Sequence, residues 1–209
     1  MKKKEIAAAA VTLLEEKYPE ARCSLEYETP FQLLVATRLS AQCTDARVNL
    51  VTPLLFGEFP TPEKMAAAPI EKIEEYIKSC GLYKTKAKSL KELSVQLCRD
   101  YGGTIPDTIE ELTKLSGIGR KTANLICGDI YGKSAVVTDT HFIRIMNRLG
   151  LVKTTEPIKV EDEMRKLLPP EKSSDFCHRT VMFGREICSA RNPKCQECIL
   201  NKICIKRGL

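Results

Sequence analysis

Two closely spaced glycines followed by two cations form the first stretch of the sequence that could do chemistry. In LTKLSGIGRKTANLI, Gly117 and Gly119 precede Arg120 and Lys121, and an apolar helical pattern follows. Glycines permit positive φ and remove side-chain bulk, so the N–H groups of the turn and of the next helix start can point outward together. A helix start of this kind favours an anion. The stretch predicts a helix–hairpin–helix that holds a nucleic-acid phosphate, although G-x-G is also common in plain turns.

Four of the ten cysteines crowd together with the spacing C-x6-C-x2-C-x5-C, namely Cys188, Cys195, Cys198 and Cys204. In a reducing compartment, such a group indicates a bound metal. Structural zinc usually takes two close ligand pairs separated by a longer span. Here one close pair has a single cysteine on each side, which suits a [4Fe–4S] cluster. Arg191 and Lys194 lie in the first loop, so a metal-pinned loop would present cations to phosphates.

A second basic stretch follows Gly81 in IKSCGLYKTKAKSL. A helix is expected to end at Gly81, and Lys84, Lys86 and Lys88 follow at alternating positions. These lysines are interpreted either as a second clamp on a nucleic-acid backbone or as a solvated basic face.

The elements that must position these residues are mostly helices. Thr29-Pro30 and Thr61-Pro62 each combine a capping residue with proline at the first helical position. Asp107 with Glu110 resembles a capping box at the start of a further helix. The only β-like candidate is the short extended piece Ala135–Val137. The sequence therefore predicts an all-α class with roughly ten helices joined by short turns.

Composition and charge are those of a globular protein. The chain has 209 residues, is 43% hydrophobic and 29% charged, and carries a net charge of +6, a mild tilt toward acidic partners. The alanine run Ala7–Ala10 is too short and its surroundings too charged for a membrane span or a signal peptide. We therefore expect a cytoplasmic protein without a targeting signal or a membrane partner.

Three of these features occur together: LSGIGRKTAN, VTDTHFIRIMNRLG and the terminal group of four cysteines. Their combination resembles endonuclease III, the DNA glycosylase/lyase of the helix–hairpin–helix superfamily with a [4Fe–4S] cluster. LLVATRLSAQCTD, GLYKTKA and MFGREIC also look like segments of that family. The resemblance covers nearly the whole chain.

The resemblance implies two helical domains that flank a DNA-binding cleft. One is a six-helix barrel over residues 23–133, with the hairpin at about 109–132. The other combines residues 1–22 and 134–209 and carries the cluster loop at 188–204. The implied partner is duplex DNA with damaged bases or abasic sites, bound by a monomer. The family removes oxidised or saturated pyrimidines and then cleaves the strand at the abasic site.

By position, the resemblance implies that Lys121 is the nucleophile and Asp139 the essential carboxylate. A lysine attacks the sugar only as the neutral amine, and a helix start beside Arg120 disfavours its charged form. The alternative for Lys121 is a phosphate-binding lysine, and the alternative for Asp139 is the N-cap of THFIRIMNRL. His141 lies in the first turn of that helix, where it either touches DNA or is structural.

The resemblance also implies that Gln42 and Leu82 enter the space left by a flipped nucleotide, and that the four cysteines hold the cluster. Gln42 can hydrogen-bond the orphaned base and Leu82 can wedge apolarly. Their alternatives are a polar helix-end residue and a hydrophobic staple. Cys43, next to Gln42, stands where alanine is frequent in the family.

Three alternatives to this function are open. Adenine glycosylases that act opposite oxidised guanine share the fold, but they typically have serine at the position of Lys121, a glutamate in the region of LVATRLSAQC, and an additional C-terminal domain. Thymine-mismatch glycosylases of the superfamily differ from endonuclease III only in details of the base-binding pocket, so they are harder to exclude. A non-catalytic iron–sulfur DNA-binding protein is a different class, which the presence of both Lys121 and Asp139 disfavours.

Overall fold

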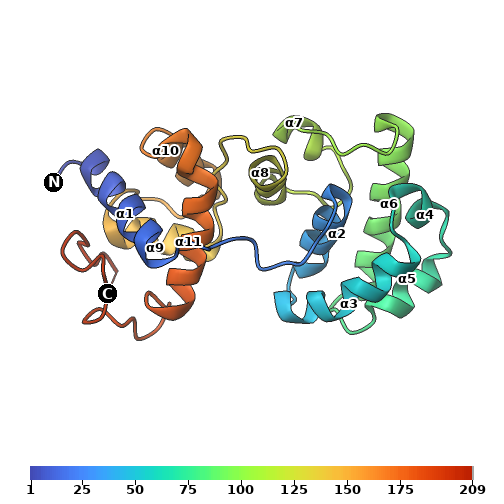
Figure 1. Cartoon of the computed structure of the whole chain (residues 1–209), viewed down its shortest axis with the longest axis horizontal. Helices are drawn as coiled ribbons and strands as arrows, with labels where there is room; N and C mark the ends of the chain where they lie inside the picture. The colour runs from blue at the N-terminus through green and yellow to red at the C-terminus, as the bar shows by residue number, and fades with distance from the viewer. Residues whose placement is uncertain (209) are drawn as a thin grey trace. The chain divides into compact units, whose positions relative to one another are not determined.

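The structure is a computed structural model that describes residues 1–208, and these residues form two compact units. We call Ser24–Tyr131 the central unit, and Met1–Cys23 together with Gly132–Leu209 the terminal unit. Figure 1 shows that both units consist of helices and connecting loops, and no strand occurs among the described residues. The all-α prediction is therefore confirmed.

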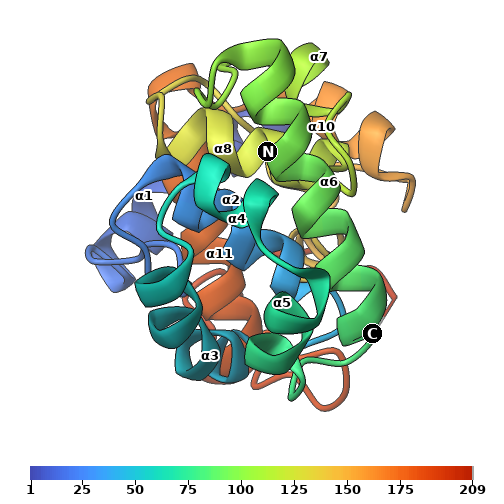
Figure 2. The same cartoon turned by 90° about the vertical axis from the view of Figure 1, so that its right-hand side faces the viewer.

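The central unit contains seven of the described helices. They are α2 (Pro30–Ser40), α3 (Asp45–Glu58), α4 (Pro62–Ala67), α5 (Ile70–Ile77), α6 (Tyr83–Tyr101), α7 (Ile109–Leu112) and α8 (Arg120–Asp129). The long helix α6 packs against α4 and α5, and α2 packs against α3, α6 and α8 (Figure 2). Leucine and isoleucine side chains fill the space between them, including Leu33, Ile73, Leu90 and Leu93.

The terminal unit is built around α11 (Ser173–Glu186). Figure 1 shows α1 and α9 beside this helix, and both contact it. The other elements of the unit are α1 (Lys3–Lys17), α9 (Thr140–Leu149), α10 (Pro157–Arg165) and the 3-10 helix η1 (Pro170–Lys172). Phe142 of α9 and Phe176 of α11 meet edge to face with ring centroids 6.1 Å apart, so aromatic packing joins these two helices.

Several helix ends follow from local capping chemistry. Thr29 and Thr61 cap α2 and α4 as predicted, each accepting a hydrogen bond from a backbone N–H three residues on, and proline follows each cap. The capping box predicted from Asp107 is wrong, because Thr108 caps α7 and its hydroxyl accepts from the N–H of Glu111. Gly102 ends α6 in the left-handed conformation.

The β-like segment Ala135–Val137 forms no strand. It is buried, and α11 supplies partners for its backbone: Ala135 donates its N–H to the hydroxyl of Ser173, and Val137 donates its N–H to the Cys177 sulfur, both at 3.2 Å. Because side chains of a helix satisfy these buried donors, the extended segment needs no partner strand. It leads directly into Asp139 at the start of α9.

Candidate functional site

The turn between α7 and α8 is held by contacts to two other helices of the central unit. Arg38 of α2 donates to the Ser89 hydroxyl of α6 at 3.0 Å, and Ser89 donates to the Ser116 carbonyl at 3.3 Å. A Cβ at Gly117 would collide with the side chains of both Arg38 and Ser89. Gly117 also has φ of +74°, so this position requires glycine both for its backbone conformation and for space.

Gly119 plays a different part from Gly117. Its φ is −94°, so the predicted need for positive φ is correct at Gly117 and wrong at Gly119. A Cβ at Gly119 would meet nothing within 4 Å, and the residue is the N-cap of α8 without a side-chain cap bond. The helix start is thus open in front, where its N–H groups and dipole favour an anion. Arg120 and Lys121 are both exposed at this end.

The two glycines therefore make a matched pair of substitutions. Gly117→Ala is expected to lower the free energy of unfolding by about 2 kcal/mol or more, since it adds left-handed strain to a steric collision. Gly119→Ala is expected to cost less than about 1 kcal/mol, while its methyl group obstructs the helix start and weakens DNA binding. Urea unfolding and duplex-binding titrations separate the two effects. Equal stability of the two variants would contradict the tight fit inferred at Gly117.

The residues proposed to fill the space of a flipped nucleotide lie on two adjacent turns of the central unit. Gln42 follows α2 and Leu82 precedes α6, and a Cβ at Gly81 would lie 3.5 Å from the Gln42 carbonyl oxygen. Both residues have a left-handed backbone conformation, with φ of 56° for Gln42 and 58° for Leu82. Both side chains are exposed, and that of Leu82 is 62% exposed. Positive φ is uncommon outside glycine and often occurs at functional sites. The structure thus brings Gln42 and Leu82 together on one surface.

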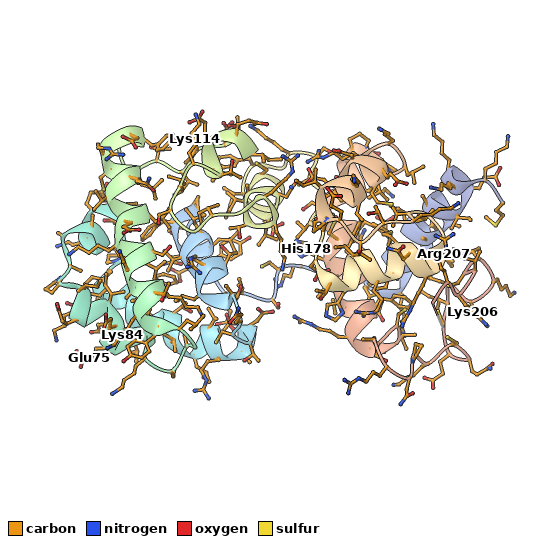
Figure 3. The ribbon with its side chains drawn as sticks, turned by 180° about the vertical axis from the view of Figure 1, so that it is seen from behind. Glu75, Lys84, Lys114, His178, Lys206 and Arg207 are labelled. Carbon is orange, nitrogen blue, oxygen red and sulfur yellow. The ribbon has the colours of Figure 1, made fainter. Side chains whose placement is uncertain are left out.

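The lysines after Gly81 do not share one environment. Lys84 is exposed near the beginning of α6, where Figure 3 shows its side chain at the edge of the central unit. Lys86 is only 1% exposed, because residues two apart on a helix point in different directions. The interpretation of the whole stretch as a surface clamp is therefore wrong for Lys86, while Lys84 remains a candidate for a DNA contact.

Asp139 is the N-cap of α9 in the terminal unit. Its Oδ1 accepts the N–H of Phe142 at 2.7 Å, so the capping alternative raised by the sequence is correct as a description of the structure. The carboxyl group is only partly buried. Capping uses one acceptor of a carboxylate that has several, so it is compatible with a chemical role for Asp139.

His141 is half-buried in the first turn of α9. Burial lowers the pKa of its imidazole, the Asp139 charge opposes this change, and Arg144 and Arg185 add to it. His141 Nδ1 lies 3.1 Å from the Arg144 guanidinium, and a Cβ at Gly184 would press against the imidazole ring. The histidine is thus held in place within the terminal unit, and it is neutral near pH 7.

The four cysteines of the C-terminal motif line a single cavity in the terminal unit. Ile145, Leu149, Phe183 and Leu200 supply apolar walls to this cavity. Burial raises the pKa of Cys198 and Cys204, and the neighbouring cysteines contribute to the same rise. Four thiols gathered in an apolar cavity are the donor set of an iron–sulfur cluster, so the residues fit such a group.

No three His, Cys, Asp or Glu side chains in residues 1–208 lie close enough to hold one metal ion. Arg191 and Lys194 are exposed on the loop between the first two cysteines, as the sequence suggested.

Two arginines of α9 hold the cysteine loop, and the sequence reasoning missed both. Arg148 is 5% exposed and donates to the Cys188 sulfur at 3.2 Å, to the Ser189 carbonyl at 2.7 Å and to the Ala190 carbonyl at 3.1 Å. Arg144, one helical turn earlier, donates to the Cys188 carbonyl at 2.8 Å. The available signal was their i,i+4 spacing in HFIRIMNRLG, which places both on one helix face.

Arg148→Met is expected to keep the volume of the side chain and remove its hydrogen bonds. Three partly buried contacts to Cys188, Ser189 and Ala190 would be lost, at a cost of about 2 kcal/mol, and the cysteine loop would loosen. We expect faster bleaching of the visible iron–sulfur absorbance in air and a lower unfolding temperature. Arg191→Met is the control, because this exposed arginine lies on the same loop. Equal bleaching of the two variants would mean that Arg148 does not hold the loop.

The predicted site residues are thus distributed over both units. The hairpin, Lys121, Gln42, Leu82 and Lys84 belong to the central unit. The terminal unit contains Asp139, His141, the four cysteines and the cations of their loop.

Comparison with known protein families gives two matches. Residues 35–170 match the model described as HhH-GPD superfamily base excision DNA repair protein. Residues 188–204 match the model described as the iron-sulfur binding domain of endonuclease III, which covers the first to the last of the four clustered cysteines.

Individual relatives agree with these matches. Endonuclease III of Synechocystis sp. is 44% identical over 97% of this chain and 93% of its own length. The structure of a trapped endonuclease III–DNA covalent intermediate has a TM-score of 0.91 and 39% identity, covering 99% of this chain and 97% of the other. A thermostable thymine-DNA glycosylase has a TM-score of 0.86 and 26% identity, covering 97% of this chain and 95% of the other.

Within residues 1–208, every helix is too short or too polar to serve as a membrane span. The open helix start beside two cations and the four cysteines of the cavity lie within the segments that the family models match. Identity to endonuclease III extends over nearly the full length of both chains. The chain therefore belongs to the endonuclease III family, the bifunctional DNA glycosylases/AP lyases of base excision repair, and carries the iron–sulfur domain of that family.

Proposed function

We propose that this enzyme excises oxidised or saturated pyrimidines from duplex DNA and that Lys121 is its nucleophile. The observation that carries the proposal is the open start of α8, where an exposed lysine stands beside a capless helix N-terminus. A backbone phosphate at that helix start would place the sugar of a flipped nucleotide within reach of an amine on the first turn. We also propose that the central unit is the six-helix barrel of the family.

The reaction proceeds through a covalent intermediate on Lys121. The neutral amine attacks the sugar C1′, the bond from C1′ to the base breaks, and the base departs with the bonding electrons. Opening of the sugar leaves an iminium that draws electrons from C2′. Loss of a C2′ proton then expels the 3′ phosphate by β-elimination, and hydrolysis of the imine returns the lysine.

Asp139 supplies the carboxylate for this reaction. It accepts a proton from the attacking amine and stabilises positive charge that develops on the sugar. The assignment is supported by its place in VTDTHFIRIMNRLG and by its fixed position at the start of α9, where the Phe142 N–H holds the carboxylate.

Gln42 and Leu82 stabilise the opened duplex. Flipping a nucleotide costs a few kcal/mol, and less for a damaged base. The two exposed side chains on adjacent turns offset this cost: Gln42 hydrogen-bonds the orphaned base, and Leu82 occupies the space in the stack. His141 and Lys84 provide further DNA contacts at their respective helix starts.

Cys188, Cys195, Cys198 and Cys204 would hold the [4Fe–4S] cluster through their thiolates. When bound, the cluster would crosslink the C-terminal loops. The loop that it fixes presents Arg191 and Lys194 to phosphates, which strengthens DNA binding in a salt-dependent manner. The enzyme acts in the cytoplasm as a monomer.

Borohydride trapping on a panel of lesion duplexes tests the substrate class. The panel contains an oxidised pyrimidine, thymine opposite guanine, adenine opposite oxidised guanine, and an undamaged control. We expect a covalent adduct with the oxidised pyrimidine and none with the undamaged duplex. Base release from the thymine mismatch alone would favour the mismatch alternative, which the likeness to a thymine-DNA glycosylase supports. Absence of an adduct on every damaged duplex would overturn the lyase mechanism.

A further inference from the structure

Two thiols outside the cluster motif interact in the central unit. Cys43 lies on the turn after α2, and Cys80 lies on the turn between α5 and α6. The turns that carry the two residues adjoin, since a Cβ at Gly81 would lie 3.5 Å from the Gln42 carbonyl oxygen, and Cys43 is among the groups that raise the pKa of the Cys80 thiol. Both residues follow a helix end: the Cys43 N–H donates to the Ser40 carbonyl at 3.0 Å, and the Cys80 N–H donates to the Ile77 carbonyl at 2.8 Å.

The two thiols differ in access. Cys43 is half-buried, whereas Cys80 is 1% exposed. Burial raises the pKa of Cys80 to about 11, and the neighbouring Cys43 contributes to the rise. An oxidant from solvent therefore reaches Cys43 first, and Cys80 is placed behind it as a second thiol.

The charge of a buried lysine, Lys86, acts on the Cys80 thiol. Lys86 is 1% exposed, and its Nζ has no hydrogen-bond partner among the described residues. Its positive charge, together with that of Arg47, lowers the pKa of Cys80 and so partly opposes the effect of burial. A lysine is almost never fully buried unless it is paired, and a thiolate at this position would provide the missing partner.

The thiol pair also adjoins the residues that are proposed to contact the opened duplex. Gln42 immediately precedes Cys43, and Leu82 lies two residues beyond Cys80. The backbones of the two turns approach each other closely, as the distance of 3.5 Å from a Gly81 Cβ to the Gln42 carbonyl shows. In Figure 3 this turn can be found between the labelled residues Glu75, in α5, and Lys84, in α6.

We propose that Cys43 and Cys80 are an oxidation site that closes to a disulfide in the presence of a hydroperoxide and thereby locks the two turns together. The effect on DNA rests on the proposed roles of Gln42 and Leu82, whereas formation of the bond does not. Hydrogen peroxide is the oxidant that balances the reaction, and a cellular dithiol reverses it.

The chemistry takes two steps. The Cys43 thiolate attacks one peroxide oxygen, the O–O bond breaks, and sulfenic acid forms with release of hydroxide. The Cys80 thiolate then attacks the Cys43 sulfur, the S–O bond breaks, and the S–S bond forms with release of a second hydroxide. The two thiol protons convert both hydroxides to water, so two thiols and one hydrogen peroxide yield one disulfide and two waters.

The disulfide would oppose DNA binding through the adjacent turns. Gln42 and Leu82 must enter the duplex from backbone conformations that are already strained, and a covalent link between their turns limits any adjustment on binding. We therefore expect at least about tenfold weaker binding to a lesion duplex in the oxidised protein, which corresponds to about 1.4 kcal/mol.

The test uses the full chain with its cluster. Protein is treated with equimolar hydrogen peroxide, alkylated with N-ethylmaleimide, digested and analysed by mass spectrometry. We expect a peptide that joins Cys43 to Cys80, lost on reduction with dithiothreitol and absent from Cys43→Ala and Cys80→Ala. Cys98→Ala, which removes a half-buried thiol elsewhere in the central unit, is the control and keeps the crosslink.

Binding to a non-cleaved lesion duplex is measured in parallel, with visible absorbance confirming that the cluster is intact. Peroxide should weaken binding by wild type and by Cys98→Ala, and dithiothreitol should restore it, while Cys43→Ala stays unaffected. Conversion of Cys43 to sulfinic acid without the joined peptide, or equal weakening in Cys43→Ala, would overturn the proposal. Peptide mapping detects the disulfide without any enzymatic turnover. The disulfide can therefore be tested even if the proposed base excision is wrong.

Discussion

Lys121→Gln is expected to abolish the borohydride-trapped adduct and to lower strand cleavage at oxidised pyrimidines by more than about 10³-fold. Glutamine preserves the length and polarity of the side chain but has no amine that can form the iminium. Lys121 is exposed on the first turn of α8, so its replacement should leave the unfolding temperature unchanged. Denaturing gels after reduction measure the adduct, and thermal unfolding checks the fold.

Arg120→Gln is the matched control, because it removes the neighbouring cation from the same helix start. This variant should keep the adduct at saturating protein while binding DNA more weakly. Loss of one phosphate contact should reduce the slope of log affinity against log salt by about one. If Lys121→Gln retained the adduct, or if Arg120→Gln lost it, the division of labour between these two cations would be wrong.

Asp139→Asn is expected to slow base release by roughly 10²–10³-fold with DNA binding preserved. Asparagine keeps an oxygen that can accept the Phe142 N–H, so α9 remains capped. It lacks the charge that accepts a proton and stabilises the cationic sugar. Single-turnover base release on an oxidised-pyrimidine duplex measures the loss, and equilibrium titration measures binding.

Asp139→Ala separates the two roles of this carboxyl group. It removes both the charge and the cap, so it should lose as much activity as Asp139→Asn and in addition about 1 kcal/mol of the free energy of unfolding. Normal turnover by Asp139→Asn would leave Asp139 as a helix cap only. Comparable unfolding of the two variants would instead show that the cap contributes little.

Local signals predicted most of the helical framework. Thr29 and Thr61 cap the helices expected of them, and Gly102 ends α6, because capping and helix termination depend on residues within one turn of each other. The same locality explains an error: Asp107 and Thr108 both have a capping oxygen, and α7 uses that of Thr108, one residue beyond the predicted cap. Residue type and spacing do not distinguish between two adjacent capping residues.

Sequence patterns did not predict the burial and contacts of residues whose partners lie far away in the chain. Lys86 looked like its exposed neighbours but is buried, and Arg148 looked like an ordinary helix cation but holds the cysteine loop. The sequence pattern indicated the same role for Gly117 and Gly119, yet only at Gly117 would a Cβ collide with Arg38 and Ser89. The partners of Arg148 and Gly117 lie dozens of residues away in the chain.

By itself, the sequence determined the all-helical class, the four-cysteine metal motif and the presence of a lysine behind a glycine hairpin, since these depend on residue type and short spacing. Only the tertiary structure decided that the turns carrying Gln42 and Leu82 adjoin and that Ala135–Val137 remains extended without a partner strand among the described residues. The physical reason is that burial and long-range contact arise from packing between helices, which a local pattern does not encode.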